Sequence, residues 1–152
     1  KRLEEVEKLV ETTKKEGAKV LMGGKRPPEF NKGFYYEPTV FDGVEDNFTI
    51  MKEEPFGPLV PMLSFKSFDE IIERSNNNDL GLCSYICTNS MEQAHKASEL
   101  METGVVAVNT PVVAIAEAPF GGIKQTGYGR EGGSNAIKDY LNVKYTHLGL
   151  KG

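Results

Sequence analysis

The middle of the sequence alternates between two hydrophobic periods, and this alternation restricts the possible folds more than any other feature. Three short apolar runs are typical of strands: residues 60–65, 82–88 and 105–109. Two segments with helical spacing separate them, and each opens with a capping box that begins at Ser67 or Ser90. Strands that alternate with helices imply βαβ units with right-handed crossovers. We therefore predict an α/β fold with a mainly parallel sheet and flanking helices.

The N-terminal part adds a helix and two short strands. Apolar residues at helical spacing open the chain, and Gly17 stands where a helix would end. A strand is predicted over residues 18–22, followed by a Pro-rich loop over residues 25–33. Residues 34–41 are aromatic and β-branched, which favours a further strand. Because Pro38 lies within them, we expect this strand to be irregular or at a sheet edge.

The C-terminal part is dominated by a long segment rich in Gly and Pro, residues 110–133. A loop of this length in a compact domain is usually functional or disordered. After it, Ser134 can cap a short helix that runs to Tyr140. Residues 143–148 can form a final strand.

The charge balance and the apolar runs exclude several classes of function. The formal net charge is −4 with no basic run, so we expect no nucleic-acid partner. The apolar runs are too short to span a bilayer and no secretory signal is visible, so no membrane partner is expected. Only two cysteines, Cys83 and Cys87, occur, which favours a reduced, cytoplasmic setting. Because the first residue is Lys1 and not Met, we expect a chain that begins inside a longer polypeptide or was trimmed.

Residues 53–58 combine two adjacent carboxylates, an aromatic ring and a Gly-Pro turn. Pro55 and Pro58 restrict the backbone on both sides of Phe56. A stiff loop can hold a carboxylate near a ligand hydroxyl and a ring against a flat heterocycle. On these residues alone, a turn with a solvated acidic pair and a core Phe remains the alternative interpretation.

Residues 118–131 hold four glycines within nine positions, which is typical of a binding loop. This is not a Walker loop, because Lys124 is not followed by Ser or Thr. Gly127, Gly129 and Gly132 match a dinucleotide-binding spacing, but no strand leads into them and too little chain follows for a βαβ unit. A Gly-rich phosphate-binding loop is therefore a weak alternative.

Five segments, in this order and spacing, resemble motifs of the aldehyde dehydrogenase family. They are Tyr-Glu-Pro-Thr at residues 36–39, Glu-Glu-Pro-Phe-Gly-Pro at 53–58, and the segments 76–82, 104–109 and 119–131. One departure is Leu80, which stands where the family has an aromatic residue. The likeness covers essentially the whole chain and implies a part of the aldehyde dehydrogenase catalytic domain.

The resemblance implies a role for several of these residues. Glu54 corresponds to the family carboxylate that binds the nicotinamide ribose hydroxyls of NAD or NADP, and Phe56 to the ring beside the nicotinamide. Phe120 corresponds to a position that lines the substrate funnel. Asn109 is interpreted as an organiser of the site, and Arg130 with Glu131 as a structural polar network.

The C-terminal segments look most like succinate-semialdehyde dehydrogenases. In one branch of those enzymes a serine in the loop before the Gly-rich motif holds the substrate carboxylate, and the corresponding position here is Ala114. This departure weakens the assignment, and other small semialdehydes or hydroxyaldehydes stay open. NAD and NADP also stay open.

The family chemistry needs a cysteine nucleophile and a glutamate base, and the resemblance places both upstream of Lys1. We therefore expect no catalytic residue within the chain. Cys83 and Cys87 are interpreted as strand residues, and no His or further Cys lies at ligand spacing for a metal. His95 is expected at the surface, and Lys124 as a structural charge and not an imine-forming amine.

The resemblance therefore implies a fragment of an enzyme that oxidises a small aldehyde, with succinate semialdehyde as one candidate, through a cysteine thioester. Its expected partners are the aldehyde, the remainder of the parent chain and further copies in a dimer or tetramer. The predicted organisation is a catalytic-domain portion over residues 1–142 and a terminal strand over residues 143–152 used in oligomerisation. The alternative hypothesis is a non-catalytic assembly or interaction module derived from that domain.

Overall fold

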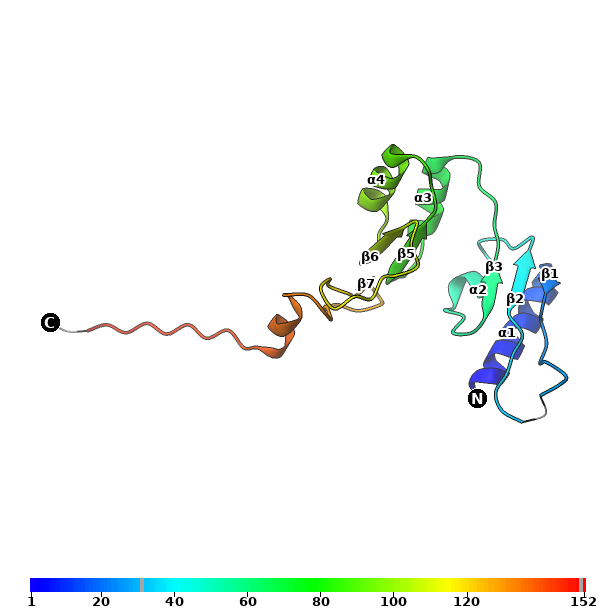
Figure 1. Cartoon of the computed structure of the whole chain (residues 1–152), viewed down its shortest axis with the longest axis horizontal. Coiled ribbons are helices and arrows are strands. Elements are labelled where there is room, and N and C mark those ends of the chain that lie inside the picture. The colour runs from blue at the N-terminus through cyan, green and yellow to red at the C-terminus, as the bar shows by residue number, and fades with distance from the viewer. Residues whose placement is uncertain (31, 151) are drawn as a thin grey trace. The chain divides into compact units, whose positions relative to one another are not determined.

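The computed structural model describes residues 1–30, 32–150 and 152 (Figure 1). The backbone divides into two compact units, Lys1–Ser67 and Phe68–Gly152. Each unit mixes helices with short strands, which confirms the α/β class. In the described part of the chain, no helix is both long and apolar enough to cross a membrane.

The first unit opens with helix α1, Arg2–Glu16. Its buried face consists of Val6, Leu9, Val10 and Thr13, which recur at the spacing of one helix face. The helix ends at Gly17, whose φ of 118° lies in the left-handed region that favours glycine. Helix α1 therefore confirms the helix that the sequence predicts.

A three-stranded sheet follows, in the order β1-β2-β3. Its strands are β1 (Lys19–Met22), β2 (Thr39–Asp42) and β3 (Leu59–Pro61), and the short helix α2 (Thr49–Lys52) lies between β2 and β3 in the sequence. Strand β2 pairs antiparallel with β1 and parallel with β3.

Two strand predictions in this unit need correction. The strand expected over residues 34–41 forms only from Thr39, and it lies at the centre of its sheet and not at an edge. Pro38 precedes the first paired residue, so its missing N–H costs no ladder hydrogen bond. The strand expected over residues 60–65 is shorter and ends at Pro61.

The core of the first unit lies where α1 and α2 pack on the sheet. Phe41, Ile50 and Val10 are its most deeply buried apolar side chains. The hydroxyl of Thr13, also fully buried, donates to the Leu9 carbonyl oxygen at 2.8 Å, so its burial leaves no unsatisfied polar group.

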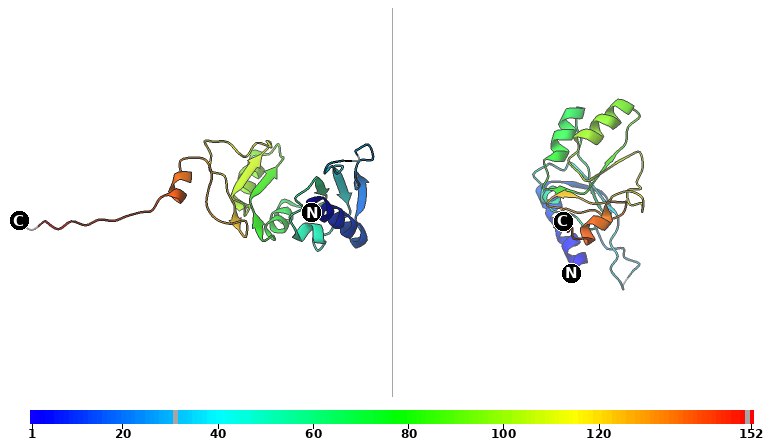
Figure 2. Two further views of the ribbon diagram at one scale, coloured as in Figure 1. Left: turned by 90° about the horizontal axis from the view of Figure 1, so that it is seen from below. Right: turned by 90° about the vertical axis from the view of Figure 1, so that its left-hand side faces the viewer.

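The second unit contains one βαβ unit of the predicted kind. Strands β5 (Cys83–Ile86) and β6 (Val105–Val108) pair in parallel, and helix α4 (Met91–Leu100) connects them. Ser90 caps α4, and its hydroxyl accepts a hydrogen bond from the Gln93 amide at 3.3 Å. Helix α3 (Phe68–Asn76) lies beside α4 on one side of the β5–β6 pair (Figures 1 and 2).

The prediction of a mainly parallel sheet was wrong, because the strands are divided among three small sheets of mixed direction. Strand β3 pairs with β2 and not with a strand of the second unit. Strands β4 (Leu80–Gly81) and β7 (Ile123–Lys124) form an antiparallel pair. Strands β1 and β2 are joined by a loop without a crossover helix, and such connections produce antiparallel pairing.

Helix α4 is only partly covered by its neighbours. Ala97 is buried, but Met91 is 83% exposed and Leu100 is also exposed. The helix contacts α3 near its own C-terminal end, where Asn76 of α3 donates to the Leu100 carbonyl. Its first turn has no described neighbour that covers Met91.

The C-terminal predictions also need correction. The short helix is a 3₁₀ helix, η1 (Ala136–Tyr140), and its N-cap is Asn135, not Ser134. The strand expected over residues 143–148 does not form: described residues 141–150 have no ladder partner and are exposed throughout. A strand needs a neighbouring backbone to satisfy its N–H and C=O groups, and the described residues offer none to this segment.

Replacing Phe41 by Ala is expected to lower the free energy of unfolding of the first unit by about 3–5 kcal/mol. The side chain is fully buried, so the change removes apolar burial and leaves a cavity between α1 and the sheet. Val60→Ala is the matched control, because Val60 lies on the same sheet and is half exposed. Urea unfolding of both variants measures the difference, and equal losses would contradict this description of the core.

Candidate functional site

The loop that carries Glu54 and Phe56 follows helix α2 directly in the first unit. Local backbone bonds hold it: the Phe56 amide donates to the Glu54 carbonyl at 2.9 Å, and the Leu59 amide to the Gly57 carbonyl at 2.8 Å. A Cβ on Gly57 would lie 2.7 Å from Val6 Cγ2 on α1, so glycine is required for this close approach. The loop is therefore stiffened by its prolines and packed against α1.

Both side chains expected at the cofactor are presented to solvent from this loop. Glu54 is exposed, and the Phe56 ring is 70% exposed although it is a large apolar group. The Arg2 guanidinium carbon lies 5.8 Å from the centre of that ring, a cation–π distance. An exposed carboxylate and a largely exposed ring on one stiff loop fit a ligand that combines vicinal hydroxyls with a flat heterocycle.

Phe120 lies in the second unit, at the start of a hairpin over residues 120–131, here called the Phe120 hairpin. Its amide donates to the Glu131 carbonyl at 2.7 Å, and the Glu131 amide donates back at 2.8 Å. The ring is half-buried. It lines a pocket of about 370 Å³ together with Leu82, Tyr128, Arg130, Asp139 and Tyr140.

Close backbone contacts explain the glycines of this hairpin. A Cβ on Gly104 would collide with the Gly121 carbonyl, and one on Gly121 with the Gly129 carbonyl. Arg130 Nη1 donates to the carbonyl oxygens of Gly122 at 2.9 Å and Gly129 at 2.6 Å. Arg130 therefore has the structural role that the resemblance implies, and Glu131 contributes its backbone.

Ala114 lies in the exposed loop after β6. Its methyl group offers no hydrogen bond to a carboxylate, so the polar contact that a serine would make there is absent from this side chain. Glu54 and Phe56 share one loop of the first unit, whereas Phe120 and Ala114 belong to the second.

Asn109 has the expected organising geometry. Its backbone adopts a φ of 56°, which is uncommon for a residue other than glycine. Its side-chain amide forms two hydrogen bonds with the Thr88 backbone, accepting from the N–H at 3.0 Å and donating to the C=O at 2.8 Å. Asn109 therefore joins the end of β6 to the loop between β5 and α4.

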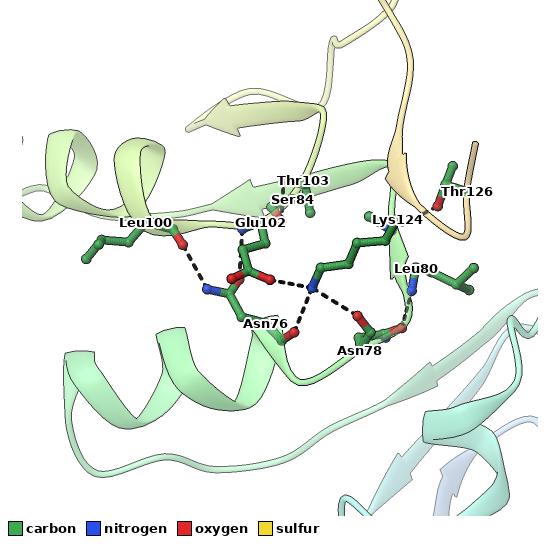
Figure 3. Close-up of polar contacts among 10 residues, drawn as sticks. Asn76, Asn78, Leu80, Ser84, Leu100, Glu102, Thr103, Lys124 and Thr126 are labelled. Atoms are coloured by element: carbon green, nitrogen blue, oxygen red, sulfur yellow. Dashed lines mark hydrogen bonds and ion pairs between the residues drawn. The ribbon is translucent and has the colours of Figure 1, made fainter. Parts of the chain in front are cut away.

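The sequence predicts that Lys124 is a structural charge, and the structure shows which groups its ammonium contacts. Its ammonium lies 2.7 Å from the Asn76 carbonyl oxygen, 3.0 Å from the Asn78 carbonyl oxygen and 2.6 Å from a Glu102 carboxylate oxygen (Figure 3). Sequence reasoning did not identify Asn76 and Glu102 as its partners. The available signal was the end of α3 at Asn76, where unpaired carbonyls attract a lysine.

The two cysteines lack the environment of an activated nucleophile. Burial raises the pKa of the Cys83 thiol, an effect only partly opposed by a hydrogen bond from Tyr85, whereas a reactive cysteine needs its pKa lowered. Cys87 is exposed, and both thiols are free. His95 is exposed on α4, as expected. Among the described residues, no three His, Cys, Asp or Glu side chains group closely enough to hold a metal ion.

The sequence matches that of known proteins over nearly its whole length. Human retinaldehyde dehydrogenase 3 is 43% identical over 150 residues, which cover 99% of this chain and 29% of the relative. The mitochondrial succinate-semialdehyde dehydrogenase of Arabidopsis thaliana is 41% identical over 148 residues, which cover 97% of this chain and 28% of the relative. The chain thus spans less than a third of the length of these relatives.

Solved structures give the same result. The NAD⁺ complex of an aldehyde dehydrogenase from Bacillus cereus superposes with a TM-score of 0.93 at 43% identity, covering 99% of this chain and 30% of that one. An NADP-dependent enzyme from E. coli superposes with a TM-score of 0.91 at 36% identity, covering 98% and 31%. Residues 1–146 match the aldehyde dehydrogenase family, and the chain therefore belongs to that family.

Proposed function

We propose that the chain is the C-terminal part of the catalytic domain of an NAD(P)-dependent aldehyde dehydrogenase, which oxidises a small aldehyde to the carboxylic acid. The observation that carries the proposal is the stiff loop that exposes both the Glu54 carboxylate and most of the Phe56 ring. Family membership supports it. When bound, the nicotinamide ring would supply the hydride acceptor.

In this proposal the chain's own residues bind and orient, and they do not react. Glu54 accepts hydrogen bonds from ribose hydroxyls, which fixes the sugar relative to the loop. Phe56 offers its exposed face to the flat ring. Phe120 contributes apolar surface to the path of the aldehyde. The nucleophile and the base belong to the remainder of the parent protein.

A small aldehyde suits the role of Phe120, and succinate semialdehyde is one candidate. Identity is nearly equal to a retinaldehyde dehydrogenase and to a succinate-semialdehyde dehydrogenase, so relatedness favours neither substrate. Ala114 provides no polar group for a substrate carboxylate. NAD and NADP are both retained as cofactors.

A non-catalytic assembly module is the second candidate. One observation favours it: residues 141–150 are exposed and unpaired, and Val143, Tyr145 and Leu148 offer apolar side chains to a partner. In either proposal this segment acts as the terminal strand predicted over residues 143–152. It pairs with a sheet of a second copy in a dimer or tetramer. A cytoplasmic location is part of the same proposal.

Exchanging Glu54 for Gln tests the proposed role of this carboxylate in cofactor binding. In the full-length protein that contains this chain, E54Q should raise the KM for NAD(P) about tenfold, because hydrogen bonds to a charged acceptor are stronger by about 1–1.5 kcal/mol. E53Q is the matched control, since it removes the neighbouring exposed carboxylate of the same motif. Steady-state kinetics measure both, and equal effects would remove the special role of Glu54. No oxidation of any aldehyde by the unaltered protein would favour the assembly module.

Thiol alkylation tests the claim that this chain holds no activated cysteine. C87S leaves Cys83 as the only thiol, and C83S leaves Cys87. Because burial raises its pKa, Cys83 carries less thiolate at pH 7 to 8 and should react severalfold more slowly with iodoacetamide than an ordinary thiol. Its rate should still be rising above about pH 8.5, where a free cysteine titrates. A rate for Cys83 that is already at its plateau at pH 7 would contradict the assignment of the nucleophile to another part of the protein.

A further inference from the structure

The Lys124 ammonium has as many oxygen acceptors around it as it has N–H donors. A lysine side chain has three N–H donors and no acceptor. Three oxygens surround this one, the carbonyls of Asn76 and Asn78 and a carboxylate oxygen of Glu102, all within 3.0 Å (Figure 3). We call these three groups the oxygen cage. The Lys124 side chain is 24% exposed, so water competes weakly for the ammonium.

The oxygen cage joins three elements of the second unit. Asn76 is the last residue of α3, and Asn78 lies in the turn before β4. Glu102 follows α4, and its amide donates to Asn76 Oδ1 at 2.8 Å. Asn76 Nδ2 donates in turn to the Leu100 carbonyl at 2.8 Å. Lys124 thus contacts the C-terminal end of α3 directly, where the helix dipole favours positive charge, and reaches the segment after α4 through the Glu102 carboxylate.

Lys124 also stands at the point where the backbone leaves strand β7. Its φ of 55° is a strained conformation for a residue with a Cβ. On either side of Lys124 the chain is bound to the β4 segment. Before it, Ile123 pairs with Gly81 in the antiparallel ladder. After it, the Gln125 amide donates to the Asp79 carbonyl at 2.9 Å, and Thr126 Oγ1 accepts from the Gly81 amide at 2.9 Å. The cage holds the side chain of the one residue whose backbone is strained between these contacts.

We propose that Lys124 is a positioning residue whose ammonium, held in the oxygen cage, orients the Phe120 hairpin and thereby sets the place of the Phe120 ring. Gly121 and Gly122 separate Phe120 from β7, and glycines by themselves do not restrict backbone direction. The backbone direction of Gly121 and Gly122 is then set from both ends. The Phe120–Glu131 backbone pair fixes the end before them, and β7 with Lys124 fixes the end after them. The consequence for catalysis rests on the function proposed for Phe120.

A structurally matched control lies on α4. Lys96 also contacts a carboxylate at 2.6 Å, that of Glu92, but the pair is exposed and contains a single acceptor group. Exposed pairs of this kind contribute little to stability. K124M and K96M each keep the aliphatic stem and remove one ammonium. A difference between them therefore reports the oxygen cage and not the loss of a charge.

The first test uses the 152-residue chain and measures amide hydrogen exchange residue by residue. K124M should speed exchange of the Phe120 and Glu131 amides about tenfold or more, as loss of a charge-assisted network implies. Exchange of the Val10 amide in the first unit should stay unchanged, and K96M should leave all of these amides unchanged. Unaltered Phe120 and Glu131 amides in K124M would overturn the proposal, and so would an equal acceleration throughout the second unit.

Chemical rescue supplies a readout that a general stabilising role would not produce. K124A leaves the oxygen cage vacant, so ethylammonium, which carries the same –NH₃⁺ donors, should restore protection of the Phe120 amide. Tetramethylammonium has the same charge and no N–H donor, and should not. Equal effects of the two cations would contradict the cage.

The second test uses the full-length protein and separates KM from kcat. K124M should raise the KM for the aldehyde about tenfold and leave the KM for NAD(P) within about twofold, because a displaced Phe120 alters the aldehyde path alone. E102Q, which removes the charge of one acceptor, should give a smaller change in the same direction. A change in kcat with both KM values unaltered would overturn the link to Phe120. If the protein oxidises no aldehyde, the proposed function fails, and amide exchange still decides whether Lys124 orients the hairpin.

Discussion

The contact on which the second unit most depends is the one between the Lys124 ammonium and three oxygens from α3, the turn before β4 and the end of α4. Among its described residues, the buried hydrophobic side chains are Ala97 and Ala107, two small groups. Apolar burial of that size contributes little stability. The packing of the elements of this unit against one another therefore depends on directional polar contacts, most of which involve Lys124 or Asn76.

The first unit follows the opposite principle. Phe41, Ile50 and Val10 are buried between helices and sheet, and the loop with Glu54 and Phe56 packs on the same helix through Gly57 and Val6. A carboxylate and a ring on a well-packed support need no rearrangement before a ligand arrives, which lowers the cost of binding. The loop with Glu54 and Phe56 and the segment around Lys124 thus reach stiffness by different means.

Much of this arrangement could be predicted from the sequence. The helix before Gly17, the capped helix after Ser90 and the strand at Val105–Val108 follow from local spacing and capping, which are properties of a few neighbouring residues. The motif around Glu54 and the Gly-rich segment were identified from residue type and order. The role of Lys124 as a structural charge was expected, but its partners were not, because Asn76 and Glu102 lie 48 and 22 residues away from it in the sequence.

Strand pairing is the part of the fold that could not be predicted from the sequence. The alternation of strands and helices predicted a parallel sheet, yet β3 pairs with β2, β4 pairs with β7, and residues 143–148 pair with no described strand. A strand is completed by hydrogen bonds to another backbone, and the sequence of the strand alone does not name that partner.

By itself the sequence determined most of the helices and strands and the order of the family motifs, because helix periodicity, capping and stiff prolines act over a few residues. Only the tertiary structure decided which strands pair, that the Phe56 ring is largely exposed, and that one lysine joins the end of α3 to Glu102 after α4. Those outcomes depend on atoms brought together from distant positions, where burial and hydrogen-bond geometry are properties of the fold.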